Sequence, residues 1–217
     1  MTDWMQRWEN GETGWHKGDT NARLIEYIDC LKLEQGSTVF VPLCGKSLDM
    51  LYLLKQGYKV IGVELSSLAA DAFFQENAIA YSVQQASNFK VYNGNNIRIF
   101  CGDYFALDEG HLQAVSAVYD RAALIALPVN LRAKYAQHLY AIIPADCQIL
   151  LLTLNYPQEQ SSPPPFAIDE TAVNALFERF ECQQLGCFDD IKNEPKYQQF
   201  GVKFMEKATY CLRKKQE

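Results

Sequence analysis

Several side chains able to bind a ligand stand directly after apolar, strand-like runs of the sequence. Glu64 ends one such run and lies 19 residues after Gly45, while Asp103 and the pair Asp120-Arg121 follow two later runs. An acid at the end of the second strand of an α/β fold holds the two ribose hydroxyls of a nucleoside. The planar fork of an arginine binds a carboxylate through two hydrogen bonds. The spacing therefore predicts the cofactor end of a nucleoside-binding α/β enzyme.

The remaining acids in this set allow more than one interpretation. Asp103 either accepts a hydrogen bond from an exocyclic amine such as adenine N6, or only caps a turn. Asp120 and Arg121 form either a surface ion pair or a grip on a zwitterionic ligand. Within that grip, Asp120 is either a proton acceptor or a group that orients Arg121.

All three tryptophans fall in the first 15 residues, at Trp4, Trp8 and Trp15. A helical turn over Asp3–Arg7 would carry Trp4 and Trp8 on one face. These rings either cover the core as a cap or form a lid over a ligand. A lid would stack on adenine or make a cation–π contact with a sulfonium. We treat residues 1–20 as an N-terminal lid or cap segment.

The segment from Ser37 to Glu64 positions the first of these groups. It reads as strand, turn, helix and strand, with two β-branched runs at Thr38–Val41 and Lys59–Val63. Gly57 suits the position just after the helix, where a left-handed conformation is common. Strands that are apolar on both faces are typical of a buried parallel sheet. This segment is therefore a βαβ unit with a right-handed crossover.

The rest of the chain continues the alternation of helices and strands and then departs from it. The loop Asn155–Asp169, rich in proline, is either a second wall of the site or a long connection. Two late strands without a helix between them, Glu181–Asp189 and Lys203–Arg213, predict an antiparallel hairpin. We expect one domain over residues 1–217: an α/β, Rossmann-like sheet of about seven strands, mostly parallel, with a C-terminal antiparallel hairpin and helices on both faces. The other expected elements are helices at Asn21–Leu33, Leu68–Asn77, Leu131–Ile143 and Glu170–Phe180, strands at Phe89–Tyr92, Ile97–Cys101, Ala114–Tyr119 and Cys147–Leu154, and a polar loop including residues 84–88.

Composition argues against several classes of protein. The net charge is −6 and the only basic run is terminal, so we expect no nucleic-acid partner. The seven cysteines form no CxxC motif and lie apart from the histidines, so we expect neither a metal site nor a disulfide framework. No apolar segment is long enough for a signal peptide or a membrane span, which predicts a cytoplasmic protein without a membrane partner. No exposed apolar heptad pattern stands out, which favours a monomer.

The turn after the first strand limits the cofactor. Pro42-Leu43-Cys44-Gly45-Lys46-Ser47 has a single glycine, whereas a pyrophosphate needs close backbone approach at several points. A dinucleotide is therefore disfavoured, and the segment does not fit a P-loop. Adenosine joined to methionine needs no phosphate cradle. A sheet of this architecture is associated with S-adenosylmethionine-dependent methyltransferases.

Longer motifs resemble one family over nearly the whole chain. Arg7-Trp8-Glu9, Gly14-Trp15-His16, VPLCGKSLDM, VIGVELS and DRAALIALP occur in the order and spacing of the bacterial branch of the thiopurine S-methyltransferase family. The resemblance implies methyl transfer from S-adenosylmethionine to the sulfur of small aromatic or heterocyclic thiols. It implies that Trp15, which falls where the family usually has Phe, faces this acceptor. The cofactor contacts that the resemblance implies are Trp8, Leu43, Gly45, Glu64 and Arg121, with Asp103 and Tyr104 on the adenine side.

Other functions stay open at this stage. The acceptor is either a thiol of this kind or another small molecule, such as a tellurite or selenium species, a halide or a metabolite thiol. A non-catalytic S-adenosylmethionine-binding module is a different class, and a dinucleotide oxidoreductase is the third. Thiols of aromatic heterocycles are already ionised near neutral pH, so methyl transfer to them needs no strong general base. Positioning and exclusion of water then supply most of the acceleration.

Overall fold

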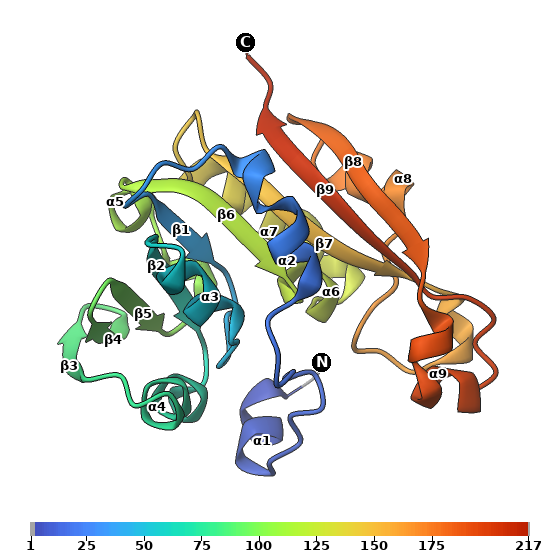
Figure 1. Ribbon diagram of the computed structural model, residues 1–217, viewed down its shortest axis with the longest axis horizontal. Helices are drawn as coiled ribbons and strands as arrows, with labels where there is room; N and C mark the ends of the chain where they lie inside the picture. The colour runs from blue at the N-terminus through green and yellow to red at the C-terminus, as the bar shows by residue number, and fades with distance from the viewer. Residues whose placement is uncertain (1–2, 217) are drawn as a thin grey trace.

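A single mixed sheet organises the computed structural model, which describes residues 3–216 (Figure 1). Its nine strands lie in the order β3-β4-β5-β2-β1-β6-β7-β9-β8. The five central strands, from β5 to β7, pair in parallel, and the strands on either side pair antiparallel. The strands are β1 (Thr38–Val41), β2 (Lys59–Glu64), β3 (Tyr81–Ala86), β4 (Phe89–Gly94), β5 (Ile97–Cys101), β6 (Val115–Arg121), β7 (Gln148–Asn155), β8 (Phe180–Asp189) and β9 (Glu206–Lys214).

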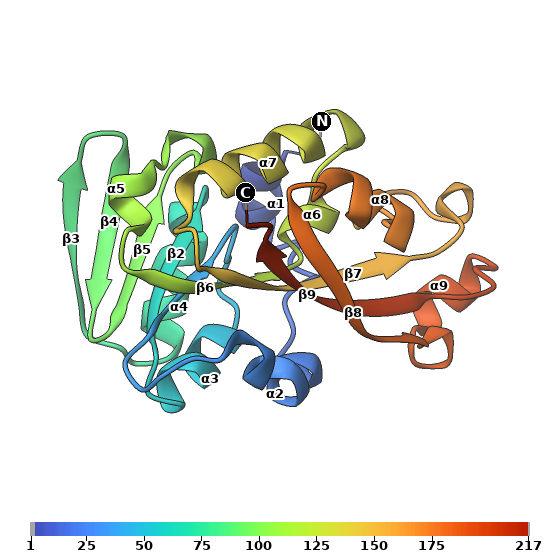
Figure 2. The same ribbon diagram turned by 90° about the horizontal axis from the view of Figure 1, so that it is seen from above.

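Helices cover both faces of this sheet, as Figure 2 shows from above. One face carries α2 (Ala22–Tyr27), the 3-10 turn η1 (Ile28–Leu31), α3 (Asp49–Lys55) and α4 (Ser67–Glu76). The other face carries α5 (Glu109–Leu112), α6 (Ala123–Ala126), α7 (Val129–Ile142) and α8 (Glu170–Leu176). The remaining helical segments are α1 (Trp4–Glu9), η2 (Tyr104–Ala106), η3 (Gln158–Gln160), η4 (Ile191–Asn193) and α9 (Pro195–Gln199). The α/β architecture, the helices on both faces and the C-terminal antiparallel pair β8–β9 are confirmed.

The βαβ unit β1–α3–β2 forms where its residues predict it. All four residues of β1 are buried, as expected for a strand covered on both faces. Gly57 follows the helix with a φ of +84°, the left-handed conformation that glycine adopts without strain. The next helix, α4, begins because the Ser66 hydroxyl accepts the Ala69 N–H at 3.3 Å, and it buries Phe73 and Phe74.

The expected count of seven strands is wrong. The clearest omission is β3, which was expected as a polar loop and instead pairs with β4 at one edge of the sheet. Five of its six residues are exposed, so it carries no apolar alternation to mark it. A polar edge strand of this kind also protects the sheet against pairing with another chain.

The N-terminal and C-terminal helices are shorter than expected. The segment predicted as one helix over 21–33 divides into α2 and η1, and the helix predicted to end at Phe180 ends at Leu176. The two late strands were expected without a helix between them, but the excursion that joins β8 to β9 forms η4 and α9. Since β8 runs parallel to β7, this excursion lies at the same end of the sheet as the carboxyl ends of the central strands.

Candidate active site

Four neighbouring strands bring most of the predicted site residues to one edge of the sheet. In the order β5-β2-β1-β6, their carboxyl ends lead to Asp103, Glu64, Gly45 and Arg121. The Gly102 N–H donates to the Glu64 carbonyl at 2.9 Å, which places the turn of Asp103 beside the end of β2. Ligands of open α/β sheets bind at this edge.

Glu64 is a buried carboxylate held by two backbone amides. Its side chain Oε2 accepts the Gly45 N–H and its Oε1 accepts the Ser66 N–H, both at 2.8 Å. Burial raises the pKa of Glu64, and these hydrogen bonds limit the rise. Among the residues that the structure describes, no cation forms an ion pair with Glu64. Each oxygen keeps a lone pair for a further donor, such as one ribose hydroxyl.

The turn after β1 has an unusual backbone and is covered by an indole. Leu43 and Gly45 have φ values of +46° and +53°, in the left-handed region. A Cβ atom at Gly45 would lie 3.3 Å from Cζ2 of Trp8. Only glycine combines this conformation with so close an approach of the ring. Trp8 therefore lies directly on the turn that holds Glu64.

The tryptophans form a cluster with one another. Trp15 packs edge to face on Trp4 and on Trp8, with ring centroids 5.1 and 5.5 Å apart. The guanidinium of Arg7 lies 5.6 Å from the centroids of both Trp4 and Trp15. No residue of α1 is buried, and the three indoles remain half-buried. In Figure 1, α1 lies beyond the strand ends, between α4 and α6. The cluster thus presents aromatic surface at the edge of the sheet, outside the core.

Arg121 is tied to an acid that the sequence analysis missed. Its Nη1 lies 3.8 Å from Oδ2 of Asp49, the first residue of α3. Asp49 is 1% exposed and also accepts the Asn21 N–H at 2.7 Å and the Tyr119 hydroxyl at 3.0 Å. One carboxylate thus connects the N-terminal segment, the turn after β1 and the end of β6. An aspartate at the start of a helix commonly serves only to stabilise the helix end, so the sequence alone does not show that Asp49 connects these three segments.

Asp120 and Arg121 do not pair with each other, because successive residues of a strand point to opposite faces. Asp120 is fully buried on the α7 side, where its Oδ2 accepts the Tyr135 hydroxyl at 2.6 Å and its Oδ1 accepts the Leu124 N–H at 3.3 Å. Burial raises the pKa of Asp120 to about 6, while these hydrogen bonds lower it. Its contacts orient the turn that follows Arg121, where Ala122 has a φ of +76°. The geometry favours an orienting role for Asp120 over contact with an acceptor.

Asp103 and Tyr104 divide between the surface and the core. The carboxylate of Asp103 is exposed and its Oδ1 accepts the Phe105 N–H at 2.9 Å, which caps η2. Tyr104 is 6% exposed, and its hydroxyl donates to the Tyr135 carbonyl at 3.4 Å. The adenine-side position implied for Asp103-Tyr104 stays a prediction, and within it the side chain of Tyr104 packs beneath α7 while that of Asp103 is exposed.

His16 is a second group near the site that sequence reasoning did not select. Burial lowers its pKa, as do the nearby charges of Lys46 and Arg121, while Glu76 raises it. Lys46 itself pairs with Glu76, with Nζ and Oε1 2.7 Å apart. The imidazole is therefore neutral at pH 7 and lies within electrostatic range of the arginine on β6.

The proline-rich segment 156–168 is an ordered part of the same edge. The Phe166 N–H donates to the Ile125 carbonyl and the Ile168 N–H to the Leu154 carbonyl, each at 2.7 Å. Tyr156 packs with Tyr197 of α9, with ring centroids 5.6 Å apart. The segment and the β8–β9 excursion thus support each other beside β7.

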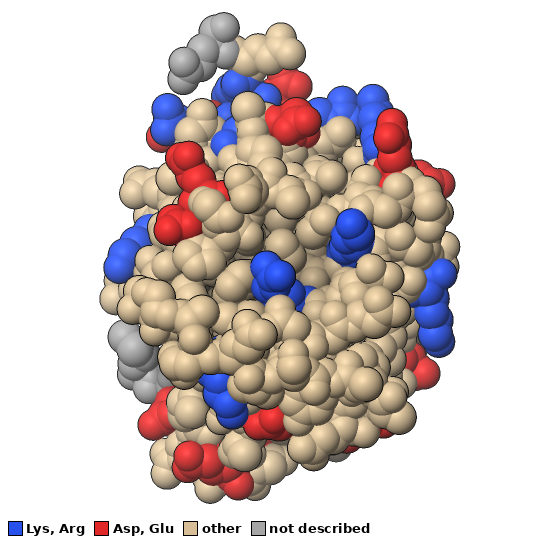
Figure 3. Space-filling model, turned by 90° about the vertical axis from the view of Figure 1, so that its left-hand side faces the viewer, with Lys and Arg blue, Asp and Glu red and all other residues tan. Residues whose placement is uncertain are grey.

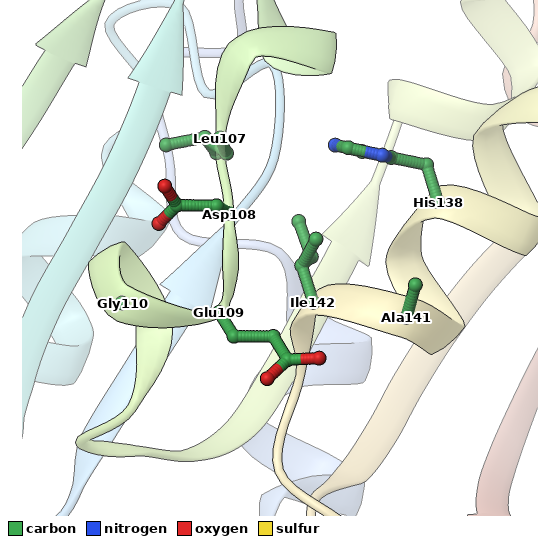
Figure 4. Close-up of a pocket in the computed structure, with 7 residues that line it drawn as sticks. All are labelled: Leu107, Asp108, Glu109, Gly110, His138, Ala141 and Ile142. Carbon is green, nitrogen blue, oxygen red and sulfur yellow. The ribbon is translucent and has the colours of Figure 1, made fainter.

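A hollow of about 520 Å³ lies elsewhere, between α5 and the C-terminal half of α7 (Figure 4). The imidazole of His138 points into it opposite Leu107. It faces the amino ends of the strands, because α7 runs back across the sheet, so it is separate from Glu64 and Arg121. It is also wide open to solvent.

The surface charge and the side-chain groupings of the described residues indicate no second functional site. The face shown in Figure 3 carries acidic and basic side chains interspersed among wide uncharged areas. The part of the chain that the structure describes has no group of three His, Cys, Asp or Glu side chains placed to hold a metal ion. Between residues 3 and 216, none of the helices is both long and apolar enough to cross a bilayer.

Comparison with known proteins shows the family of the chain. The chain matches the model of the family described as thiopurine S-methyltransferase over residues 1–215. It is 42% identical to a thiopurine S-methyltransferase of Xanthomonas axonopodis pv. citri over 213 residues, which is 98% of each chain. It is 41% identical to one of Nitrosospira multiformis over 210 residues, which is 96% of each chain.

The fold is also that of solved methyltransferases. A crystal structure of an S-adenosylmethionine-dependent methyltransferase from Anabaena variabilis superposes with a TM-score of 0.66 at 15% identity, covering 98% of this chain and 93% of that one. The likeness at this identity concerns the fold, while the family match spans nearly the whole sequence. The chain belongs to the thiopurine S-methyltransferase family, whose members are S-adenosylmethionine-dependent methyltransferases.

Proposed function

We propose that this enzyme methylates the sulfur of small aromatic or heterocyclic thiols, and that Glu64, Gly45, Trp8 and Arg121 hold its cofactor. The observation that carries the proposal is the buried carboxylate of Glu64, which has no ion-pair partner among the described residues and whose remaining lone pairs suit two hydroxyl donors. When bound, S-adenosylmethionine supplies an electrophilic methyl group on a cationic sulfur.

The residues around Glu64 fit such a cofactor. Asp103 is exposed beside the end of β2, where its second oxygen is able to accept an exocyclic amine. Arg121 keeps part of its fork free, because Asp49 engages it at 3.8 Å through one nitrogen. That fork suits the carboxylate of an amino acid. Trp8 supplies an aromatic face, which attracts a cation.

The chain's own contribution to methyl transfer is positioning. The acceptor approaches from the side of the tryptophan cluster, where Trp15 and the neutral imidazole of His16 are half-buried. The alternative place for Arg121 is beside an acceptor that arrives as a thiolate. Residues 3–20 act as the lid that excludes water, and they lie on the cofactor turn through Trp8. No side chain needs to remove a proton from an acceptor that is already ionised.

The first experiment measures S-adenosylmethionine binding by isothermal titration and methyl transfer to 6-mercaptopurine. Binding with turnover supports both parts of the proposal, and binding without turnover contradicts the thiol acceptor. Glu64→Gln should weaken binding roughly 100-fold, since hydrogen bonds to a charged group contribute about 1.5–3 kcal/mol each. Glu181→Gln, on exposed strand β8, is the control and should leave the affinity unchanged. Equal affinity of Glu64→Gln and the parent protein would remove the ribose assignment.

A further inference from the structure

Two cysteines that are far apart in the sequence lie next to each other where η1 packs on β9, the last strand of the chain. Cys30 belongs to η1 and Cys211 to β9. The Cys211 thiol donates to the Cys30 carbonyl oxygen at 3.7 Å, which brings the two cysteines into contact. Cys30 is partly exposed, whereas Cys211 is 2% exposed. One sulfur of the pair is therefore open to a small solute.

The segment that carries Cys30 is docked firmly on the sheet. The Tyr27 hydroxyl occupies the space above Gly186, where a Cβ atom would lie 2.6 Å from it. The guanidinium of Arg23 lies 3.8 Å from the centroid of the Phe188 ring. Both contacts are made to β8, the neighbour of the strand that carries Cys211. The two thiols thus meet between elements that are already held together.

Two cations, Arg213 and Lys32, lie near the pair. Arg213 Nε donates to Gln148 Oε1 at 3.2 Å, and the same oxygen lies 3.8 Å from the Cys211 Sγ. The hydrogen bond from Cys30 and the charges of Arg213 and Lys32 lower the pKa of Cys211 to about 7, although burial opposes this. The same interaction raises the pKa of Cys30, so the pair as a unit loses one proton near neutral pH and keeps the other between its two sulfurs.

The other five cysteines lack this environment. Burial raises the pKa of each of them, and it does so to about 11 for Cys101 and to about 12 for Cys147. Cys187 is exposed, but its pKa is raised further by the nearby carboxylates Glu206 and Glu170. Exposure alone therefore does not make a cysteine of this chain reactive.

We propose that Cys30 and Cys211 are a redox-active pair that closes to a disulfide on exposure to hydrogen peroxide. The thiolate of the pair attacks one oxygen of hydrogen peroxide, which reaches the pair beside the partly exposed Cys30; an S–O bond forms, the O–O bond breaks and hydroxide leaves. The second sulfur then attacks the sulfenic acid, forming the S–S bond and releasing water. Two thiols are oxidised, the peroxide is reduced to two waters, and a dithiol reverses the link. The inference is independent of the methyl acceptor.

Closing the bond would join the segment before β1 to the last strand. That segment starts at Asn21, whose N–H donates to Asp49 beside Arg121. Because the link spans most of the chain, it restricts the unfolded state and should raise the temperature of unfolding.

The test treats the full-length reduced protein with a small excess of hydrogen peroxide and then blocks the remaining thiols with iodoacetamide. We expect peptide mass spectrometry to find Cys30 linked to Cys211, free-thiol titration to show the loss of two thiols per chain, and dithiothreitol to restore both. Cys187→Ser should behave like the parent protein, and Cys30→Ser should lose the link. A linked peptide that contains another cysteine, or no linked peptide in the parent protein, would overturn the proposal. Mapping of the parent protein decides the question even if Cys30→Ser folds poorly.

Discussion

The buried pair Asp120 and Tyr135 makes stability depend on pH in a direction that mutagenesis can test. Asp120 has an ordinary pKa of 3.8 and a pKa of about 6 in the folded protein, chiefly because burial disfavours its charged form. The folded state therefore binds this proton more tightly than the unfolded state does. The contribution of Asp120 to stability is fully present below pH 3.8 and is lost as the pH rises through about 6. The difference corresponds to about 3 kcal/mol.

Tyr135→Phe removes the hydroxyl that donates to the Asp120 carboxylate at 2.6 Å. Such a bond to a charged group contributes about 1.5–3 kcal/mol. Its loss should raise the pKa of Asp120 above about 6. The variant should thus lose about 2 kcal/mol more unfolding free energy at pH 8 than at pH 5, where the carboxyl is mostly protonated.

Urea unfolding of the parent protein and the variant at both pH values measures this difference. Tyr104→Phe is a matched control, because its buried hydroxyl donates to a neutral carbonyl at 3.4 Å and not to Asp120. Its cost should be the same at pH 5 and pH 8. An equal cost of Tyr135→Phe at both pH values would refute the assigned charge state of Asp120.

Two further substitutions test the turn after β1 and its connections. Gly45→Ala places a methyl group 3.3 Å from Trp8 at a φ of +53°, so it should lower the free energy of unfolding by about 1–3 kcal/mol and weaken cofactor binding. The control Gly14→Ala, with no neighbour within 4 Å, should change neither the melting temperature nor the isothermal titration of the cofactor. Equal behaviour of the two variants would contradict the strain argument. Asp49→Ala leaves three donors without their buried acceptor and should lower the free energy of unfolding, measured in urea, by about 3 kcal/mol. The control Asp29→Ala, on the exposed side of η1, should lower it by less than about 0.5 kcal/mol. A loss below about 1 kcal/mol for Asp49→Ala would argue against its connecting role.

The sequence predicts best the parts of the site that depend on local structure. Strand β1, the glycine turn and β2 follow one another within about thirty residues, and each has its own signal in residue type. Glu64 is therefore found at the end of β2, and its bond to the Gly45 N–H follows because the parallel strands β1 and β2 end side by side. The family motifs extend this prediction along the chain.

Contacts between distant segments are what the sequence does not reveal. Asp49 acquires its role only when Asn21 and Arg121 reach it from two other elements. The adjacent charges at 120 and 121 suggest a pair, although strand alternation sends them to opposite faces of β6. Tyr104 is next to an exposed acid but packs in the core, because η2 turns it beneath α7.

The tryptophan cluster has a consequence for spectroscopy. Since all three indoles lie between residues 4 and 15, the intrinsic tryptophan emission of this enzyme comes entirely from the segment over the cofactor turn. Fluorescence therefore reports displacement of α1 from Gly45, whereas circular dichroism reports the sheet and its helices. An unfolding curve followed by emission should precede the one followed by ellipticity, and added cofactor should bring the two curves together.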